Sequence, residues 1–486
     1  MSDSARQALA GMLFNTFQFA GFFAVVYSLY LYFGHKNQNR MLLLASYLFY
    51  GAWDYRFLSL ILISTCVDFV CGLKIEGAKS RAHKRAFLLL SVVTNLSILG
   101  YFKYFDFFVS ELASLCQLLG LPFGYESLSI VLPVGISFYT FQTMSYSIDI
   151  YRGDMKATRK FFDFALFVAF FPQLVAGPIE RARNLLPQIT AKRTVKLEQF
   201  YLGSYLIFWG LFQKVFIADN MATLVDPVFE AGADPSGIQV MIALYAFALQ
   251  IYCDFAGYSN MARGLAKVMG IELSVNFNLP YLATNPESFW RRWHITLSDW
   301  IRDYVFLPLY IALRNYGIVG MLVATFVTYT LIGLWHGAAV TFVVWGLFHS
   351  FVFATYQVLK PSINRFYADR ATLARVMFPV NLLFFFHITL MGLLIFRASS
   401  LGQALDLAQH VMFNFDVNVV DMASVYKLIF FGWLIVLIQI FQYRKDDLLF
   451  ILKQPAPVRA LFYLICFYSL IFYGESDGKA FIYFQF

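Results

Sequence analysis

The chain has 486 residues, of which 60% are hydrophobic and only 14% are charged. Soluble domains carry about 25% charged residues, so this composition excludes an ordinary water-soluble protein. The net charge of +8 does not indicate a nucleic-acid partner, because the basic residues cluster in short loops between apolar runs, as the positive-inside rule describes. The apolar runs are continuous, not alternating, which favours membrane helices over a β-barrel.

The first apolar run follows residues 1–15, which hold one acid and one base and no positively charged leader. We therefore expect a retained helix and not a removed signal peptide. In chain order, helices in or across the membrane are expected at 17–33, 41–53, 57–73, 87–104, 107–121, 128–146, 161–175, 200–217, 238–255, 304–312, 319–335, 338–358, 373–394, 428–442 and 461–473. Because several runs are short, we predict an all-α membrane protein with about eleven crossings and re-entrant half-helices around a central tunnel.

Three of these runs favour incomplete or broken helices. Runs 41–53 and 304–312 are short enough to be half-helices. Run 161–175 contains Pro172 and precedes the Gly177-Pro178 pair, which interrupts a helix. Broken helices are tolerated at membrane depth only where protein or water surrounds them, so these runs predict an internal cavity.

The charge of the loops and the absence of linkers in the sequence indicate how the chain is organised. Segments 74–85, 181–196 and 444–459 are basic on balance and should face the cytoplasm. No linker, low-complexity tract or internal repeat is apparent, so residues 1–486 are predicted to form a single domain. The five scattered cysteines fit neither a disulfide framework nor a metal site, and we expect them to fill the apolar interior.

Segment 286–303 concentrates charged residues among three tryptophans. We predict an amphipathic helix at the cytoplasmic boundary, on which Arg291 and His294 stand three residues apart. One interpretation is an interfacial helix that is anchored by Trp and Arg. The other adds that Arg291, Arg292 and Arg302 bind the phosphates of a cytoplasmic acyl carrier, for which planar guanidinium groups are well suited.

Segment 329–350 surrounds His336 with apolar and uncharged residues. A lone histidine of this kind is more often structural, but Gly333 and Gly337 leave the backbone beside it open to another group. His349 is thirteen positions further on and should point away from His336, so it is the weaker candidate. The chain has no HExxH or GxSxG motif, which leaves a histidine general base without an ordinary protein nucleophile.

Other intramembrane polar residues argue against a transporter. Asp68, Asp149 and Asp254 are isolated in the sequence and lie near the ends of predicted helices, so they form no chain of acids for ion coupling. His387 has no polar neighbour in the sequence and is interpreted as structural.

Five stretches together resemble the membrane-bound O-acyltransferase family: 289–306 (FWRRWHITLSDWIRDYVF), 331–349 (LIGLWHGAAVTFVVWGLFH), 170–181, 252–266 and 276–290. The likeness is to the bacterial branch that contains alginate O-acetylation and teichoic-acid D-alanyl transfer proteins.

This resemblance implies specific roles for residues of the two histidine motifs. His336 matches the essential histidine, which lies in a tunnel through the membrane and would act as the general base. His294 matches the partner that is usually named with it. Beyond the resemblance, we expect His294 or Asn276 to orient a thioester carbonyl, and Trp335 to contribute to substrate or donor binding. The implied donor is acetyl-CoA or the phosphopantetheine thioester of an acyl carrier protein, docked near the arginines from the cytoplasm.

The end of the chain carries a further likeness. Residues 481–486, FIYFQF, resemble a terminal hexapeptide of this branch or of its small partner proteins, whose tyrosine has been proposed to carry the acyl group. The resemblance thus implies Tyr483 as the nucleophile once a base removes its proton. The alternative is an aromatic residue that anchors the chain at the membrane interface. One departure lies at 307–312, LPLYIA, where alginate-type members often have Leu-Gly-Gly-Asn, which weakens alginate as the acceptor.

We therefore expect a membrane O-acyltransferase of the bacterial inner membrane that moves an acyl group, most commonly acetyl in this branch, to a cell-surface or secreted polysaccharide such as alginate or peptidoglycan. Expected partners are membrane lipid, the cytoplasmic thioester donor and an extracytoplasmic esterase-like acyltransferase, without a metal, a tightly bound cofactor or nucleic acid. The alternatives are D-alanyl transfer to teichoic acid, a transporter without chemistry, and a scaffold for an extracytoplasmic acyltransferase.

Overall fold

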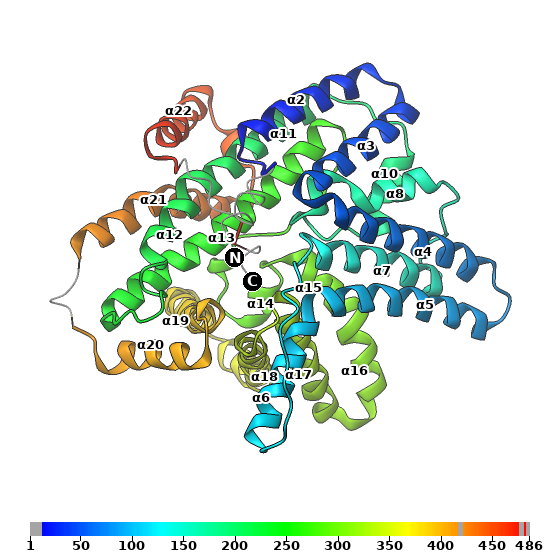
Figure 1. The fold of residues 1–486 in the computed structure, drawn as a ribbon. Coiled ribbons are helices and arrows are strands. Elements are labelled where there is room, and N and C mark those ends of the chain that lie inside the picture. Colours follow the sequence, from blue (N-terminus) through cyan, green and yellow to red (C-terminus); the bar gives the residue numbers. More distant parts are fainter. Residues whose placement is uncertain (1–11, 417–420, 476–480, 483–486) are drawn as a thin grey trace. The chain divides into compact units, whose positions relative to one another are not determined.

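The computed structural model describes residues 12–416, 421–475 and 481–482. Within these ranges every regular element is a helix (Figure 1), which confirms the all-α prediction. Nine helical stretches of the described residues are long and apolar enough to cross a membrane. The chain is therefore a multi-pass membrane protein, while the number of eleven crossings and the central tunnel stay predictions.

The α-helices follow one another along the chain from residue 17 to residue 473. Up to residue 268 they are α2 (Phe17–Tyr32), α3 (His35–Asp54), α4 (Leu58–Gly77), α5 (Arg81–Leu99), α6 (Phe105–Leu118), α7 (Ile136–Arg152), α8 (Phe161–Ala169), α9 (Phe171–Leu174), α10 (Ala182–Thr190), α11 (Leu197–Leu211), α12 (Asp219–Val225) and α13 (Gly237–Val268). From residue 286 onward they are α14 (Pro286–Trp290), α15 (Ile295–Ile301), α16 (Leu307–Leu313), α17 (Gly317–His336), α18 (Val340–Tyr367), α19 (Ala371–Arg397), α20 (Leu401–Phe413), α21 (Met422–Lys445) and α22 (Ala456–Tyr473). Short π-helical stretches are η2 (Gly100–Tyr104), η3 (Phe212–Ala218) and η5 (Arg302–Phe306).

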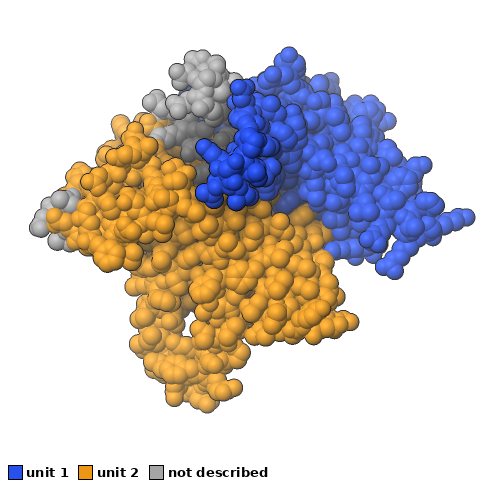
Figure 2. All heavy atoms as spheres, turned by 60° about the horizontal axis from the view of Figure 1, so that its bottom comes forward, with its two compact units in different colours: residues 1–208, 258–274, 483–485 blue, residues 209–257, 275–482, 486 orange. Residues whose placement is uncertain are grey.

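The described residues form two compact units, coloured separately in Figure 2. Unit 1 comprises 12–208 and 258–274, and unit 2 comprises 209–257 with the described residues from 275 to 482. The units are therefore interleaved along the sequence. The single-domain assignment stays a prediction.

Two expected elements differ from the structure. The predicted helix at 128–146 is wrong in its first half, because α7 begins only at Ile136, after Gly135 adopts a left-handed conformation with φ 74°. The predicted half-helix at 41–53 is also wrong: α3 has 20 residues, because its polar start, His35 to Arg40, is helical too. Hydropathy alone does not detect this polar first turn.

The predicted break in 161–175 is confirmed. Helix α8 ends at Ala169, and Phe170 interrupts the helix before the short α9. The interruption leaves the carbonyl of Phe167 without its helical partner, and the side-chain amides of Gln142 and Gln173 donate to it. The free carbonyl of this irregular backbone segment thereby receives hydrogen bonds from within the protein. At membrane depth such bonds are required, because no water is present to supply them.

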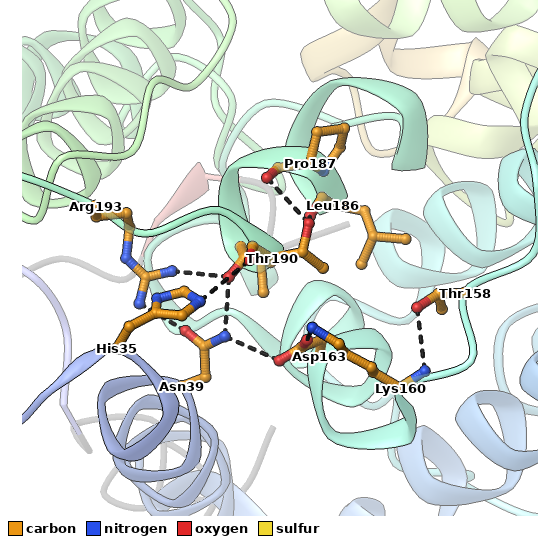
Figure 3. Close-up of polar contacts among 10 residues, drawn as sticks. His35, Asn39, Thr158, Lys160, Asp163, Leu186, Pro187, Thr190 and Arg193 are labelled. Carbon is orange, nitrogen blue, oxygen red and sulfur yellow. Dashed lines mark hydrogen bonds and ion pairs between the residues drawn. The ribbon is translucent and has the colours of Figure 1, made fainter.

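A polar cluster fastens α3 to α8 and to the segment after α10 within unit 1 (Figure 3). The Asn39 amide donates to Asp163 at 2.9 Å and accepts from the Arg193 guanidinium at 2.6 Å. His35 bonds the carbonyl of Thr190 at 3.2 Å. Asn39 is almost fully buried, so these bonds satisfy groups that would otherwise be costly to bury.

Helices α11 and α13 approach each other backbone to backbone at two glycine pairs. A Cβ atom on Gly264 would lie 2.5 Å from the Gly203 carbonyl oxygen, and one on Gly257 would lie 2.7 Å from the Gly210 oxygen. In both helices the two glycines are seven residues apart. Small residues that let helix backbones touch are a common basis of helix association in membranes.

We predict that Gly264→Ala destabilises the protein by about 1–3 kcal/mol, because the added methyl group would press against the backbone of α11. The measurement is the midpoint of thermal unfolding in detergent. Gly21→Ala is the matched control, since nothing lies within 4 Å of a Cβ atom at Gly21. Equal midpoints for the two variants would contradict the close crossing.

Candidate active site

The His294 side chain is fixed by Asn276, a residue eighteen positions earlier. Oδ1 of Asn276 lies 3.1 Å from Nδ1 of His294 and accepts from the backbone N–H of Thr296 at 3.3 Å and from its hydroxyl at 2.9 Å. The Asn276 carbonyl accepts from the N–H of Ile295 at 2.9 Å. Asn276 thus caps the start of α15 from a distant part of the chain.

These bonds determine the tautomer of His294. A backbone N–H can only donate, so the Asn276 atom that faces Thr296 is the amide oxygen, and Nδ1 of His294 must donate to that oxygen. His294 lies just before the apolar stretch 295–336 and is 1% exposed, and this burial lowers its pKa to about 3. At neutral pH the ring is therefore neutral, and its Nε2 is an acceptor.

His336 is the last residue of α17, and its ring lies in an aromatic pocket. The ring centroids of Trp335 and Trp345 each lie 5.0 Å from that of His336, and the Phe396 centroid lies 5.4 Å away. The His336 side chain is 5% exposed. Such a pocket keeps bulk water from the imidazole.

The structure brings the two predicted histidines to the same indole ring. The Trp335 centroid lies 5.6 Å from that of His294 and 5.0 Å from that of His336, with edge-to-face geometry on both sides. Phe255 of α13 meets the His294 ring at 4.7 Å. The site therefore has a histidine from each of the two motifs, with Trp335 in contact with both.

The predicted continuous helix at 286–303 is wrong. Helix α14 ends at Trp290, and α15 begins only at Ile295. Between them His294 adopts a left-handed conformation with φ 43°. Arg291 and His294 consequently do not share a helix face, and the break is what turns the His294 ring toward Asn276.

The three arginines proposed to bind phosphate lie around this break. Arg291 pairs with Glu287 at 2.6 Å, and Arg302 pairs with Asp299 at 2.6 Å, while both side chains are more than half exposed. Arg292 donates to a backbone carbonyl at 3.2 Å. Arg291 and Arg302 thus already have carboxylate partners in this structure, and binding of a donor by the three arginines stays a prediction.

The space beside the two glycines next to His336 is filled by other parts of the protein and is not open to another group. A Cβ atom on Gly333 would lie 2.2 Å from the Phe342 carbonyl oxygen, and one on Gly337 would lie 2.0 Å from the Phe342 ring. The glycines therefore allow α18 to pack closely against the end of α17. His349 is separated from His336 by the Trp345 ring, which contacts both histidines.

Two further interpretations need correction, and one candidate is not described. His387 does have a polar neighbour, because its Nε2 lies 2.8 Å from the Tyr245 hydroxyl. Asp68 is not isolated, because its carboxylate accepts from Asn95 at 2.8 Å. Tyr483 lies outside the described residues.

Sequence reasoning also missed a buried ion cluster in unit 2. The Lys214 ammonium lies 2.9 Å from a carboxylate oxygen of Asp219 and 2.8 Å from one of Asp254. Asp254 is therefore not isolated either. The five-residue spacing of Lys214 and Asp219 gave no helical pairing pattern, because this stretch is π-helical and not α-helical.

Comparison with known proteins gives a family match for part of the chain. Residues 156–397 match the membrane-bound O-acyltransferase family. Similar proteins include the probable alginate O-acetylase of Pseudomonas aeruginosa, 44% identical over 61% of this chain and 56% of that protein. The peptidoglycan O-acetyltransferase of Helicobacter pylori is 37% identical over 55% of each chain, and the teichoic acid D-alanyltransferase of Bacillus subtilis is 31% identical over 36% and 45%. The matched regions thus span less than two thirds of these relatives.

We predict that Asn276→Ala lowers the free energy of unfolding by about 1–3 kcal/mol, because it leaves buried donors of His294 and Thr296 without this acceptor. Thermal unfolding in detergent measures the loss. The matched control is Asn278→Ala, at a half-buried position nearby. If both alanine variants unfold at the wild-type midpoint, Asn276 does not hold the site together.

Proposed function

We propose that this chain, which matches the membrane-bound O-acyltransferase family over residues 156–397, is an O-acyltransferase of the bacterial inner membrane. It would move an acetyl group from a cytoplasmic thioester to a cell-surface or secreted polysaccharide. The observation that carries the proposal is the placement of the buried His294 and His336 side chains against Trp335, among other aromatic rings. Such surroundings support base chemistry on a thioester while limiting its hydrolysis.

In the proposed reaction His336 takes the proton of the acceptor hydroxyl, whose oxygen attacks the thioester carbonyl carbon. The carbon–sulfur bond breaks, and the leaving thiolate takes the proton back from His336. Removal of a proton by a positioned base contributes roughly 10²–10⁴ in rate. No metal or tightly bound cofactor is needed for this sequence of steps.

The tautomer of His294 refines its proposed role. Because Nδ1 donates to Asn276, the neutral ring has only an acceptor at Nε2 and cannot donate to the thioester carbonyl. We assign to Nε2 the acceptance of an N–H from the amide-rich arm of coenzyme A or phosphopantetheine. The carbonyl oxygen would instead meet the indole N–H of Trp345, a buried donor without a hydrogen-bond partner among the described residues.

Chemistry and the relatives support the proposed acyl group, donor and polymer. Arg291, Arg292 and Arg302 offer guanidinium groups to the donor's phosphates, if those phosphates displace the carboxylates now paired with two of them. Acetyl transfer to alginate or peptidoglycan is favoured, because two of the three relatives described above are named for O-acetyl transfer. An extracytoplasmic esterase-like acyltransferase would pass the group to the polymer, with membrane lipid around the helices.

The second candidate is D-alanyl transfer to teichoic acid, which the more distant relative supports. A transporter or scaffold without chemistry is the other class of function. Purified protein that consumes neither acetyl nor D-alanyl thioester would favour that class.

We predict that His336→Ala reduces acyl transfer by roughly 10²–10⁴, because the general base is lost. Release of free thiol from the acyl thioester by purified protein, with acceptor present, measures it. The matched control is His387→Gln, since His387 is exposed and bonds Tyr245. Wild-type transfer by His336→Ala protein of normal yield would end the proposed mechanism.

For the acceptor we predict that Tyr483→Phe abolishes acylation of the polymer, because the variant keeps the aromatic ring and lacks only the hydroxyl nucleophile. Mass spectrometry of the C-terminal peptide should show an acyl adduct on wild-type protein alone. Undiminished polymer acylation by Tyr483→Phe would reduce this tyrosine to a membrane anchor.

A further inference from the structure

The Lys214 cluster lies in a part of the molecule where charge is expensive. Lys214, Asp219 and Asp254 are each no more than 5% exposed, and all three lie in helical stretches apolar enough to span a membrane. Ionisable groups in such a place are costly and are commonly functional. Each carboxylate has two oxygens, and one oxygen of Asp254 faces Lys214, so the other can accept from a further hydrogen-bond donor.

That donor is the backbone of the chain's C-terminal segment. The N–H of Ile482 donates to Oδ2 of Asp254 at 2.7 Å, while the other carboxylate oxygen faces Lys214. Phe481 and Ile482 are each only 1% exposed. A hydrogen bond to a buried ionised carboxylate is stronger than one between neutral groups.

The same region holds the chain just before this segment. The Asn220 amide donates to the carbonyl of Tyr473, the last residue of α22, at 2.8 Å. The N–H of Glu475 donates to the Val215 carbonyl at 3.4 Å. Segment 212–220 and Asp254 therefore contact the described C-terminal residues at three backbone positions.

The π-helical geometry of η3 brings the cluster together. The N–H of Asp219 donates to the carbonyl of Lys214, five residues earlier, which is the hydrogen bond of a π-helix. This widened turn places the two side chains side by side, within 2.9 Å. π-Helical turns occur frequently at functional sites.

A chain of aromatic contacts connects the fastened segment to the candidate active site. The Phe481 ring lies 5.6 Å from the ring of Phe255, the neighbour of Asp254 in α13. The Phe255 ring lies 4.7 Å from His294. The Phe255 ring thus contacts both Phe481 and His294, a proposed active-site residue.

We infer that Lys214, Asp219 and Asp254 form a latch that holds Phe481 and Ile482 beside the His294 pocket. Tyr483 follows Ile482 in the sequence, so the acceptor role proposed for Tyr483 would depend on this latch. This last step rests on the proposed function. The three latch residues are positioning residues, because they act through the backbone of the segment and not on the thioester.

The cluster contacts the segment through the hydrogen bond to Ile482, while burial and the ring contact with Phe255 also hold the segment. The cluster itself joins η3 and α12 to α13 and should persist when the segment leaves.

The test places a photoreactive p-azidophenylalanine at position 481 of the full chain and measures its cross-linking to the peptide that contains Phe255. Ile482→Pro removes the backbone N–H and replaces the isoleucine side chain. Ile482→Ala shortens the side chain and keeps the N–H. We expect Ile482→Pro to lower the cross-link yield about tenfold, and Ile482→Ala to lower it much less. Asp254→Asn should behave like Ile482→Pro.

Without the photoreactive group, the same variants should change kcat without changing KM. Ile482→Pro should lower kcat for acyl transfer about tenfold and leave KM for the acyl thioester unchanged, because the donor site is untouched. A variant that merely unfolds would change both and lose yield. The proline change lies after α22 and outside the ion cluster, so it keeps the test valid if Asp254→Asn fails to fold.

The results separate the latch from the proposed acceptor. Equal cross-linking in the proline and alanine variants would overturn the latch, whatever the transfer rate. Loss of cross-linking in the proline variant, combined with full activity of Tyr483→Phe, would support the latch and overturn the acceptor role of Tyr483.

Discussion

The close crossing of α11 and α13 is the packing contact beside which the Lys214 ion cluster forms. At Gly203 and Gly264, and again at Gly210 and Gly257, no side chain separates the two backbones. The helices therefore lie as near as packing allows, and the continuation of α11 into η3 carries Lys214 to the carboxylate of α13. Substitution at the glycines would consequently act on the ion cluster as well as on stability.

The sequence predicted which side chains lie together in the candidate site better than it predicted the backbone that positions them. His294, His336, Asn276 and Trp335 could be predicted, because two motifs resemble a known family and the structure places these side chains in one cluster. The break at 291–294 could not, because local periodicity treats 286–303 as one helix. The left-handed conformation of His294 is disfavoured locally and is stabilised by Asn276, which no short-range pattern relates to it.

The fold shows the same division between local and long-range information. Long apolar runs predicted most helices, and Pro172 with its neighbours predicted the break between α8 and α9. The polar start of α3 and the amphipathic α20 escaped hydropathy, because their polar side chains interrupt the apolar pattern. The ion pair of Lys214 with Asp254 joins residues forty positions apart, so only the tertiary structure could reveal that an apparently isolated acid has a partner.

The indole ring between the two histidines has a consequence for how protons move. Tryptophan donates through its one N–H and has no lone pair with which to accept. A proton that reaches His336 therefore cannot pass through Trp335 to His294. In the proposed mechanism, the proton that His336 takes from the acceptor hydroxyl is therefore returned to the leaving thiolate and does not reach His294 through the Trp335 ring.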